Sequence, residues 1–429
     1  MERKKYAFPN PMKHLYLLCI ALLLPLTLTA QQPEEMADSL LLAQTNTDSI
    51  RPADTTDTAW SHTVQDRLAQ LISNPIFERT QLGLCVYDLT ADSVLFSHGE
   101  RQLLRPASCE KVLTAITALS QLGGSYRFET KLYYRGQIDD NRHCLDGDIY
   151  IVGGFDPRFG HDDLHALCEA LRDLNIDSIR GNVYLDVSMK DTASKGSGWC
   201  WDDETIRLTP LLFNGRDTFL SHLTQALAES GLKVSGEIGP LRRLPGDARF
   251  VANRFHTIDQ VLMRMLKQSD NLYAESVFYQ LGAQSHVSYA SWKYSADCVS
   301  RFISELGLNP RHYQIADGSG LSLYNYVTPQ LLVQALRYAW QRNNIYLHLY
   351  PALPIAGRDG TLRSRMRNSS ARNNVHAKTG TVEGVSTLAG YATAPNGHML
   401  CFAIMNQGLR YHSTGRNFQD RVCQVITQP

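Results

Sequence analysis

Three short strings occur in a fixed order along this chain of 429 residues, and they constrain its fold because a shared function would require them to meet in space. The strings are Ser108-Cys109-Glu110-Lys111, Ser269-Asp270-Asn271 and Lys378-Thr379-Gly380. They supply a hydroxyl nucleophile, an amine base, a pair that can relay a proton and a cation that can hold a carboxylate. Serine acyl transfer needs these groups when no histidine serves as the base. One string alone arises easily by chance, but the ordered set predicts a single active site.

The first string stands at the start of an expected helix. Apolar residues recur at steps of three and four between 112 and 122, Pro106 precedes them and Gly123-Gly124 follows them. Positions three apart lie on one face of a helix, so Ser108 and Lys111 are expected within hydrogen-bond reach of each other. The free N–H groups and the positive dipole of the helix start would favour a developing oxyanion there.

Lys111 can act as the base for Ser108 only when its amine is neutral. A free lysine has a pKa near ~10.4, and burial together with a second nearby cation would lower it. Lys378 is expected to be that second cation. Ser269 is expected to pass a proton between Lys111 and the leaving amine, while Asn271 is expected to hold Lys111 and to contact the substrate amide.

The third string is expected to bind the substrate. Strand-like sequence follows it, and an edge strand there could pair with an extended peptide. Lys378 and the Thr379 hydroxyl are expected to hold a terminal carboxylate, and Gly380 is expected to leave room for the substrate backbone. The N–H of Thr381 is expected to complete an oxyanion hole with the N–H of Ser108.

The composition is that of an ordinary globular protein, with 43% hydrophobic and 20% charged residues. Lys plus Arg equals Asp plus Glu at 42 each, and no basic stripe with interleaved aromatic residues occurs, so nucleic acid is not an expected partner. No Cys-x-x-Cys pair occurs, and no cofactor is expected. The string from His161 to His165 resembles a zinc-binding pattern, but Asp162 is too short for the usual base role. A solvated helix start is therefore expected there, and no metal site.

Residues 1–30 are expected to be a signal peptide. Basic residues precede an apolar run from Leu15 to Leu28, which is shorter than the ~20 residues that a membrane-spanning helix needs. A retained anchor is the alternative, so peripheral membrane association stays open. Residues 31–59, rich in Thr, Asp, Gln and Ala, are expected to be a flexible linker. These features predict export across the inner membrane to the periplasm.

The remaining sequence predicts a mixed α/β (α+β) protein with two domains. Residues 60–130 and 252–429 carry helical and strand-like patterns around the three strings and are expected to form the catalytic domain. Residues 131–251 contain short strand-like runs around one amphipathic helix. They are expected to form an inserted, strand-rich domain. The oligomeric state is not predicted.

Further strings carry a resemblance to a known family. They are Pro106-Ala107-Ser108, Gly147 to Pro157, Gln268 to Glu275, Asp317 to Ser322 and Gly357 to Leu362. With the three motifs, they make residues 65–425 resemble the D-alanyl-D-alanine carboxypeptidase/endopeptidase family of penicillin-binding protein 4 type. The resemblance implies a β-lactamase/transpeptidase-like fold, in which an antiparallel sheet is flanked by helices.

The resemblance also implies site roles. Ser108 would be acylated with Lys111 as its base, Ser269 and Asn271 would form the relay pair, and Lys378 would be the cation on the carboxylate side. Peptidoglycan stem peptides are the implied substrates and β-lactam antibiotics the implied inhibitors.

The inserted domain would contribute to substrate binding in such a family member. The resemblance implies that Asp156 reaches the amine of the third stem-peptide residue. Many relatives place an arginine, which can pair with a diaminopimelate carboxylate, where this chain has Leu323. The nested domain that relatives often carry is reduced or absent after Asn214.

The expected function is therefore that of a penicillin-sensitive serine D-Ala-D-Ala carboxypeptidase/endopeptidase, a D,D-peptidase. Two alternatives stay open. A β-lactamase would need a base for the deacylating water, and Glu275 and Glu383 are candidates for that base. A non-catalytic cell-wall-binding module could retain the same fold.

Overall fold

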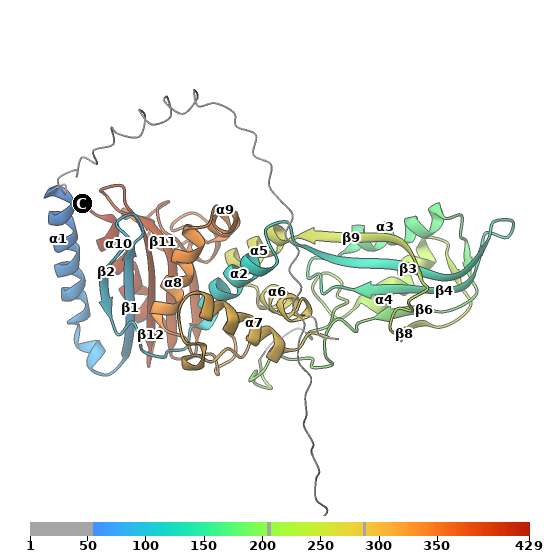
Figure 1. Cartoon of the computed structure of the whole chain (residues 1–429), viewed down its shortest axis with the longest axis horizontal. Coiled ribbons are helices and arrows are strands. Elements are labelled where there is room, and N and C mark those ends of the chain that lie inside the picture. Colours follow the sequence, from blue (N-terminus) through green and yellow to red (C-terminus); the bar gives the residue numbers. More distant parts are fainter. Residues whose placement is uncertain (1–54, 204–206, 286–288) are drawn as a thin grey trace, which may run out of the picture. The chain divides into compact units, whose positions relative to one another are not determined.

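The computed structural model describes residues 55–203, 207–285 and 289–429 (Figure 1). The predicted signal peptide, residues 1–30, and the predicted linker up to residue 54 lie outside the described residues. Helix α1, Thr55–Ile72, begins before the predicted end of the linker at residue 59. Within the described ranges, no helix combines the length and the apolar character needed to cross a membrane.

A five-stranded antiparallel sheet forms the centre of the part that carries the three motifs. In spatial order its strands are β10 (His376–Val382), β11 (Val385–Thr393), β12 (Met399–Gln407), β1 (Gln81–Asp88) and β2 (Ser93–His98). Nearly every residue of β11 and β12 is buried. Strands with two covered faces are apolar along their whole length rather than alternating. The sheet is therefore the middle layer, and β10 is one of its edges.

Helices cover both faces of this sheet (Figure 1). On one face, α1 and α10 (His412–Thr427) pack Val64, Leu68 and Val422 against Phe402 and Ile404 of β12. The other face is covered by a larger helical layer. Its members are α2 (Glu110–Gln121), α5 (Ile258–Lys267), α6 (Asn271–Ala283), α7 (Trp292–Glu305), α8 (Pro329–Trp340) and α9 (Asn343–Ala352). The fold class predicted from the sequence is confirmed.

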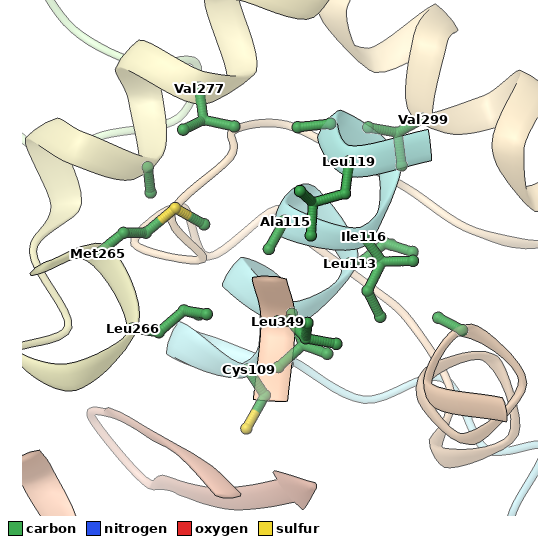
Figure 2. Packing of buried hydrophobic residues seen from close by; sticks show 14 of the residues in the cluster. Cys109, Leu113, Ala115, Ile116, Leu119, Met265, Leu266, Val277, Val299 and Leu349 are labelled. Carbon is green, nitrogen blue, oxygen red and sulfur yellow. The ribbon is translucent and has the colours of Figure 1, made fainter. Parts of the chain in front are cut away.

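Helix α2 lies inside that helical layer rather than on its surface. Figure 2 shows Leu113, Ala115, Ile116 and Leu119 of α2 among side chains of the neighbouring helices: Met265, Leu266, Val277, Val299 and Leu349. A helix that is buried on all sides belongs to the core. Its N-terminus, which follows the short 3₁₀ turn η2 (Ala107–Cys109), is therefore held rigidly.

A second sheet lies between β2 and α5 in the sequence and has its own hydrophobic core. Its strands are β3 (Arg127–Asp139), β4 (Cys144–Gly153), β5 (Ser178–Ile179), β6 (Val183–Asp186), β7 (Lys233–Val234), β8 (Ile238–Leu241) and β9 (Arg249–Thr257). Helices α3 (His161–Asp173) and α4 (Phe219–Glu229) pack on it. Strand β3 pairs antiparallel with β4 and β9, whereas β4 pairs parallel with β5 and β6. The sheet spans residues 127–257, slightly more than the predicted insertion at 131–251.

Three further 3₁₀ turns complete the described elements: η1 (Pro75–Glu78), η3 (Pro310–His312) and η4 (Gly360–Leu362). The last of these lies before β10, beside the third motif. The Thr379 hydroxyl of β10 donates to the Thr361 hydroxyl of η4 at 2.8 Å. This contact places η4 next to the candidate site.

Candidate active site

Ser108 lies in the 3₁₀ turn η2, immediately before α2, with its side chain half-buried. The preceding residue, Ala107, has a φ of 45°, in the left-handed region that residues with a Cβ rarely occupy. The turn at Gly320 packs closely against this backbone, since a Cβ on Gly320 would collide with the Ala107 carbonyl. Strained backbone of this kind persists only where the surrounding structure holds it, and it is concentrated at functional sites.

Two hydrogen bonds attach this turn to the sheet. The hydroxyl of Thr387 on β11 donates to the carbonyl of Pro106 at 2.7 Å. The thiol of Cys109 donates to the carbonyl of Lys378 on β10 at 3.1 Å. Cys109 is fully buried, so it packs against the sheet. The nucleophile is thus positioned by two strands as well as by its own helix.

Lys111 is fully buried and its amine contacts three acceptors. Its Nζ lies 3.0 Å from the Ser108 hydroxyl, 2.7 Å from Oδ1 of Asn271 and 2.7 Å from the carbonyl of Ser319. An ammonium has three donors and no acceptor, so this geometry satisfies all three. When the amine is neutral, the same contact with Ser108 lets it accept the hydroxyl proton.

Burial lowers the pKa of Lys111 to about 8, against the opposing charges of Asp317, Glu275 and Asp270. Burial and the nearby charge of Lys111 lower the pKa of Lys378 to about 7. The charge of Lys111 contributes to the lowered pKa of Lys378, whereas burial accounts for the lowered pKa of Lys111. At neutral pH the pair therefore gives up a proton far more readily than exposed lysines do.

The second motif stands at the junction of α5 and α6. Ser269 has a φ of 60°, and the carboxylate of Asp270 caps α6 by accepting from the N–H groups of Leu272 and Tyr273. The tight connection turns the Ser269 hydroxyl towards Lys378, which donates to it at 2.9 Å. It also turns Asn271 towards the base.

Lys378 lies within β10 and is fully buried. Its Nζ donates to the Ser269 hydroxyl at 2.9 Å and to the carbonyl of Thr379 at 2.6 Å. The structure thus brings Ser108, Lys111 and Asn271 into one hydrogen-bonded group. It brings Ser269 and Lys378 into a second group. The two groups are connected because Cys109, the residue after Ser108, donates its thiol hydrogen to the carbonyl of Lys378.

Gly380 is buried, and the position of a Cβ there shows why glycine is required. A Cβ would lie 2.8 Å from the carbonyl of Pro106 and 3.0 Å from the N of Cys109, and it would also collide with the Thr387 hydroxyl. The missing side chain lets β10 approach the nucleophile turn, whereas the sequence predicted room there for the substrate backbone. Thr381, the next residue, is exposed.

Asp156 makes its observed side-chain contacts within the protein. Its side chain is fully buried: Oδ2 lies 2.7 Å from Nδ1 of His256 and Oδ1 accepts from the N–H of Arg158 at 2.9 Å. Burial raises the pKa of this carboxyl, against the opposing effect of His256. Both oxygens have partners within the protein, and the implied contact with a third-residue amine stays a prediction. The carboxyl instead holds the turn that carries Arg158.

Three residues that support Lys111 were not predicted from the sequence to do so. The Ser319 carbonyl accepts from Lys111, and Oε1 of Glu275 accepts from the N–H groups of Gly318 and Ser319 at 3.1 and 2.9 Å. Asp317 closes the same turn by accepting from the N–H of Gly320 at 2.7 Å. The Asp317 to Ser322 string is the sequence feature that could have indicated this turn. The role of the Ser319 backbone carbonyl, however, cannot be predicted from residue type.

The candidate bases of the β-lactamase alternative have different surroundings. Glu275 is fully buried, and burial together with the charge of Asp317 raises its pKa to about 8. Its Oε1 is occupied by backbone N–H groups. Glu383 is exposed in the turn between β10 and β11. Oε2 of Glu275 has no hydrogen-bond partner among the described residues, and the β-lactamase alternative stays a prediction.

The sequence matches one protein-family model over most of its length. The description of that family is "D-Ala-D-Ala carboxypeptidase 3 (S13) family", and the matched residues are 64–212 and 207–428. A D-alanyl-D-alanine carboxypeptidase DacB from Haemophilus influenzae is 24% identical over 79% of this chain and 87% of its own length. A D-alanyl-D-alanine carboxypeptidase from Actinomadura sp. is 26% identical over 80% of this chain and 81% of its own length.

Solved structures share the fold. The crystal structure of penicillin binding protein 4 (dacB) from Haemophilus influenzae has a TM-score of 0.74 and 22% identity, covering 83% of this chain and 97% of that one. The same protein complexed with a β-lactam has a TM-score of 0.69 and 23% identity, covering 84% and 100%.

Proposed function

The chain belongs to the D-Ala-D-Ala carboxypeptidase 3 (S13) family and is a serine D-Ala-D-Ala carboxypeptidase, and we propose that it acts on peptidoglycan stem peptides through an acyl-enzyme at Ser108. The observation that carries the proposal is the buried amine of Lys111, which lies 3.0 Å from the Ser108 hydroxyl and 2.7 Å from Asn271. The catalytic domain in this proposal comprises residues 60–130 and 252–429, and residues 131–251 form the inserted domain.

Acylation begins when neutral Lys111 takes the proton of Ser108. The Ser108 oxygen then forms a bond to the carbonyl carbon of the D-Ala-D-Ala peptide bond, and the C–N bond breaks. The proton passes from Lys111 through Ser269 to the leaving D-alanine amine. The N–H groups of Ser108 and Thr381 stabilise the oxyanion of the tetrahedral intermediate. Water then hydrolyses the ester and restores the serine hydroxyl.

Binding of the substrate carboxylate helps to keep Lys111 in its neutral, basic form. A carboxylate held by Lys378 and the Thr379 hydroxyl raises the pKa of Lys378, because an opposite charge favours the ammonium form. The positive charge then settles on Lys378. Its repulsion lowers the pKa of Lys111 further, so Lys111 is neutral when the peptide is in place. Binding and activation of Ser108 are coupled in this way.

We also propose export. Basic residues followed by the apolar run from Leu15 to Leu28 support a signal peptide at residues 1–30. Peptidoglycan stem peptides lie outside the cytoplasm, so export to the periplasm would bring the enzyme to its substrate. Peripheral membrane association is tested by fractionation of cells that produce the full chain.

The proposal is tested by mass spectrometry of the intact protein after incubation with penicillin. One penicillin mass should be added, and peptide mapping should place it on Ser108. The Ser108→Ala variant should remain folded and take up none. Absence of an adduct on folded wild-type protein would refute the acyl-enzyme and favour a non-catalytic wall-binding module.

Two further measurements separate the related activities. Slow turnover of nitrocefin is expected for a D,D-peptidase, whereas fast turnover would identify a β-lactamase. Digestion of purified cell-wall fragments should release single D-alanines if the carboxypeptidase activity dominates. Severed cross-bridges would show endopeptidase activity, which uses the same acyl-enzyme.

A further inference from the structure

The segment from Gly357 to Arg372 concentrates positive charge in a chain whose formal net charge is zero. It contains five arginines and one acidic residue, Asp359, so its own net charge is +4 (5 − 1). The turn η4 lies within this segment. A cationic surface of this kind attracts anions, so the segment indicates an anionic partner.

Most of these guanidinium groups lack a counter-charge among the described residues. Arg365 pairs with Asp420 at 2.6 Å, and Asp359 is itself held by Lys267 at 2.7 Å. The other four arginines are exposed, and no carboxylate in the described part of the chain lies within ion-pair distance of them. They are Arg358, Arg363, Arg367 and Arg372. The segment can therefore offer its charge to a ligand.

The turn η4 is fixed between the second and third motifs. Lys267, at the end of α5, donates to both carboxylate oxygens of Asp359 at 2.9 and 2.7 Å. A Cβ on Gly360 would lie 2.7 Å from the carbonyl of Lys267, so the turn packs directly against the end of that helix. The exposed residue Thr361 accepts from the Thr379 hydroxyl of β10 at 2.8 Å. The turn therefore forms a wall of the active site beside the third motif.

Two of the exposed arginines flank this wall. The N–H of Gly357 donates to the carbonyl of Leu362 at 3.0 Å, which closes the chain into a loop around Thr361. Arg358 follows the first residue of this pair and Arg363 follows the second, so both leave the loop from neighbouring points. Leu362 is fully buried and anchors the loop. A fixed backbone lowers the entropic cost of binding an anion there.

The proposed binding mode gives the substrate a direction along β10. The N–H of Thr381 meets the scissile carbonyl, and Lys378 with the Thr379 hydroxyl holds the carboxylate of the leaving residue. The leaving residue therefore lies at the Thr379 end of the site, beside Thr361, and the acylating peptide extends the other way. When a cross-bridge is cut, the leaving residue belongs to a second peptide, which continues past this wall towards the two arginines.

We infer, on the basis of the D,D-peptidase function proposed above, that Arg358 and Arg363 bind carboxylates of the peptide on the leaving side of the scissile bond. The guanidinium fork matches a carboxylate geometrically, and charge-assisted pairs are the strong ones. A leaving D-alanine has one carboxylate, which Lys378 holds, so its release gains nothing from the two arginines. The enzyme therefore prefers to cut a bond to an acidic second peptide, and these residues favour endopeptidase substrates.

The test compares two synthetic tripeptides, N-acetyl-L-Ala-D-Ala-D-Xaa, in which Xaa is 2-aminoadipate or its side-chain amide. The two differ only in the charge on the side chain of the leaving residue. Wild-type enzyme should cleave the carboxylate form with a kcat/KM about tenfold higher, which corresponds to ~1.4 kcal/mol. The double variant Arg358→Gln, Arg363→Gln should reduce this ratio to about one. The ratio is measured within each variant, so a partial loss of folded enzyme cancels.

Arg311→Gln is the matched control, because Arg311 is an exposed arginine on η3, which lies outside the segment and packs on α7. It should keep the wild-type ratio. Equal cleavage of both tripeptides by wild-type enzyme, or an unchanged ratio in the double variant, would overturn the inference and leave the D,D-peptidase function standing.

Purified cell-wall fragments provide a second measurement that does not depend on the tripeptides. The number of severed cross-bridges per released D-alanine should fall in the double variant relative to wild type and Arg311→Gln. An unchanged number would overturn the inference, even if wild-type enzyme forms the penicillin adduct but cleaves neither tripeptide. Cleavage of neither tripeptides nor fragments, together with no penicillin adduct, would instead contradict the proposed function and the inference with it.

Discussion

The amine of Lys111 and the side-chain oxygen of Asn271 lie 2.7 Å apart, although 160 positions separate the two residues in the sequence. The side chain of Lys111 is long and flexible. Its hydrogen bonds to Asn271 and to the Ser319 carbonyl, the latter at 2.7 Å, direct the amine towards Ser108. The local helical geometry at the start of α2 only places Ser108 and Lys111 on the same face of the helix. The α5–α6 junction supplies the orientation, so the base is fixed by two separate elements.

Replacement of Asn271 should therefore impair acylation while leaving the fold intact. In Asn271→Ala the amine of Lys111 loses one of its three acceptors and its direction towards Ser108 is no longer fixed. We expect the second-order rate of penicillin acylation to fall by about 10²–10³-fold, as on removal of a preorganised catalytic hydrogen-bonding group. Asn344→Ala, on the exposed side of α9, is the control and should react at the wild-type rate. A wild-type rate in Asn271→Ala would contradict the orienting role.

The rate of acylation should depend on pH because the active form carries one proton on the lysine pair. Burial lowers the pKa of Lys111 to about 8 and that of Lys378 to about 7. Below this range both amines are charged and no base is available. Above it both are neutral and the cation for the carboxylate is lost. Coupled groups titrate as a pair, so the profile should be a bell with its maximum between about 7 and 8.

The measurement is the second-order rate of penicillin acylation followed from about pH 5.5 to pH 10. The ascending limb reports loss of the first proton from the pair in the free enzyme. A rate that stays flat across this interval would show that neither lysine titrates there. A limb near ~10.4 would show that burial does not perturb Lys111.

Much of the fold could be predicted from periodicity. Helix α2 was expected within a few residues of its observed bounds, because its apolar residues repeat with a clear period. Helix α9 was not predicted, since Leu347 is exposed and Pro351 lies inside the helix. Helix α8 was also missed, although Thr328 before Pro329 is a recognisable helix start.

The third motif shows the limit of local patterns. Strand-like sequence was expected after it, yet Lys378, Thr379 and Gly380 lie inside β10. Lysine and glycine have low strand propensity, so tertiary packing against η2 decides the conformation there. The contact between Asp156 and His256 could not be predicted from local patterns either. His256 lies in β9, which pairs with β3 and is distant from Asp156 in the sequence.

Gly380→Ala should test whether close packing of β10 on η2 positions the nucleophile. The added methyl would meet the Pro106 carbonyl at 2.8 Å and the N of Cys109 at 3.0 Å, and these backbone atoms have little room to move. Overpacking of this kind costs about 1–3 kcal/mol of unfolding free energy. Displacement of Ser108 should slow penicillin acylation on the order of 10- to 100-fold.

The control for this substitution is Gly246→Ala, where a Cβ meets nothing within 4 Å. It should keep both the wild-type stability in denaturant and the wild-type acylation rate. If Gly380→Ala acylates normally, β10 and η2 can separate without moving Ser108. The contact would then be structural only.

Glu275 should make the stability of the protein depend on pH. Burial and the charge of Asp317 raise the pKa of this carboxyl from 4.5 to about 8. The folded state therefore holds a proton that the unfolded state has released, and stability that is present below pH 4.5 is lost as the pH rises towards 8. Glu275→Gln keeps an acceptor for the N–H groups of Gly318 and Ser319 but cannot ionise. Relative to this variant, the wild-type free energy of unfolding should fall by a few kcal/mol between pH 5 and pH 8, measured by urea titration.

Glu383→Gln, at an exposed position, provides the matched control without loss of a buried carboxyl. A constant difference between wild type and Glu275→Gln across that interval would show that Glu275 is ionised in the folded protein, with Lys111 as its counter-charge.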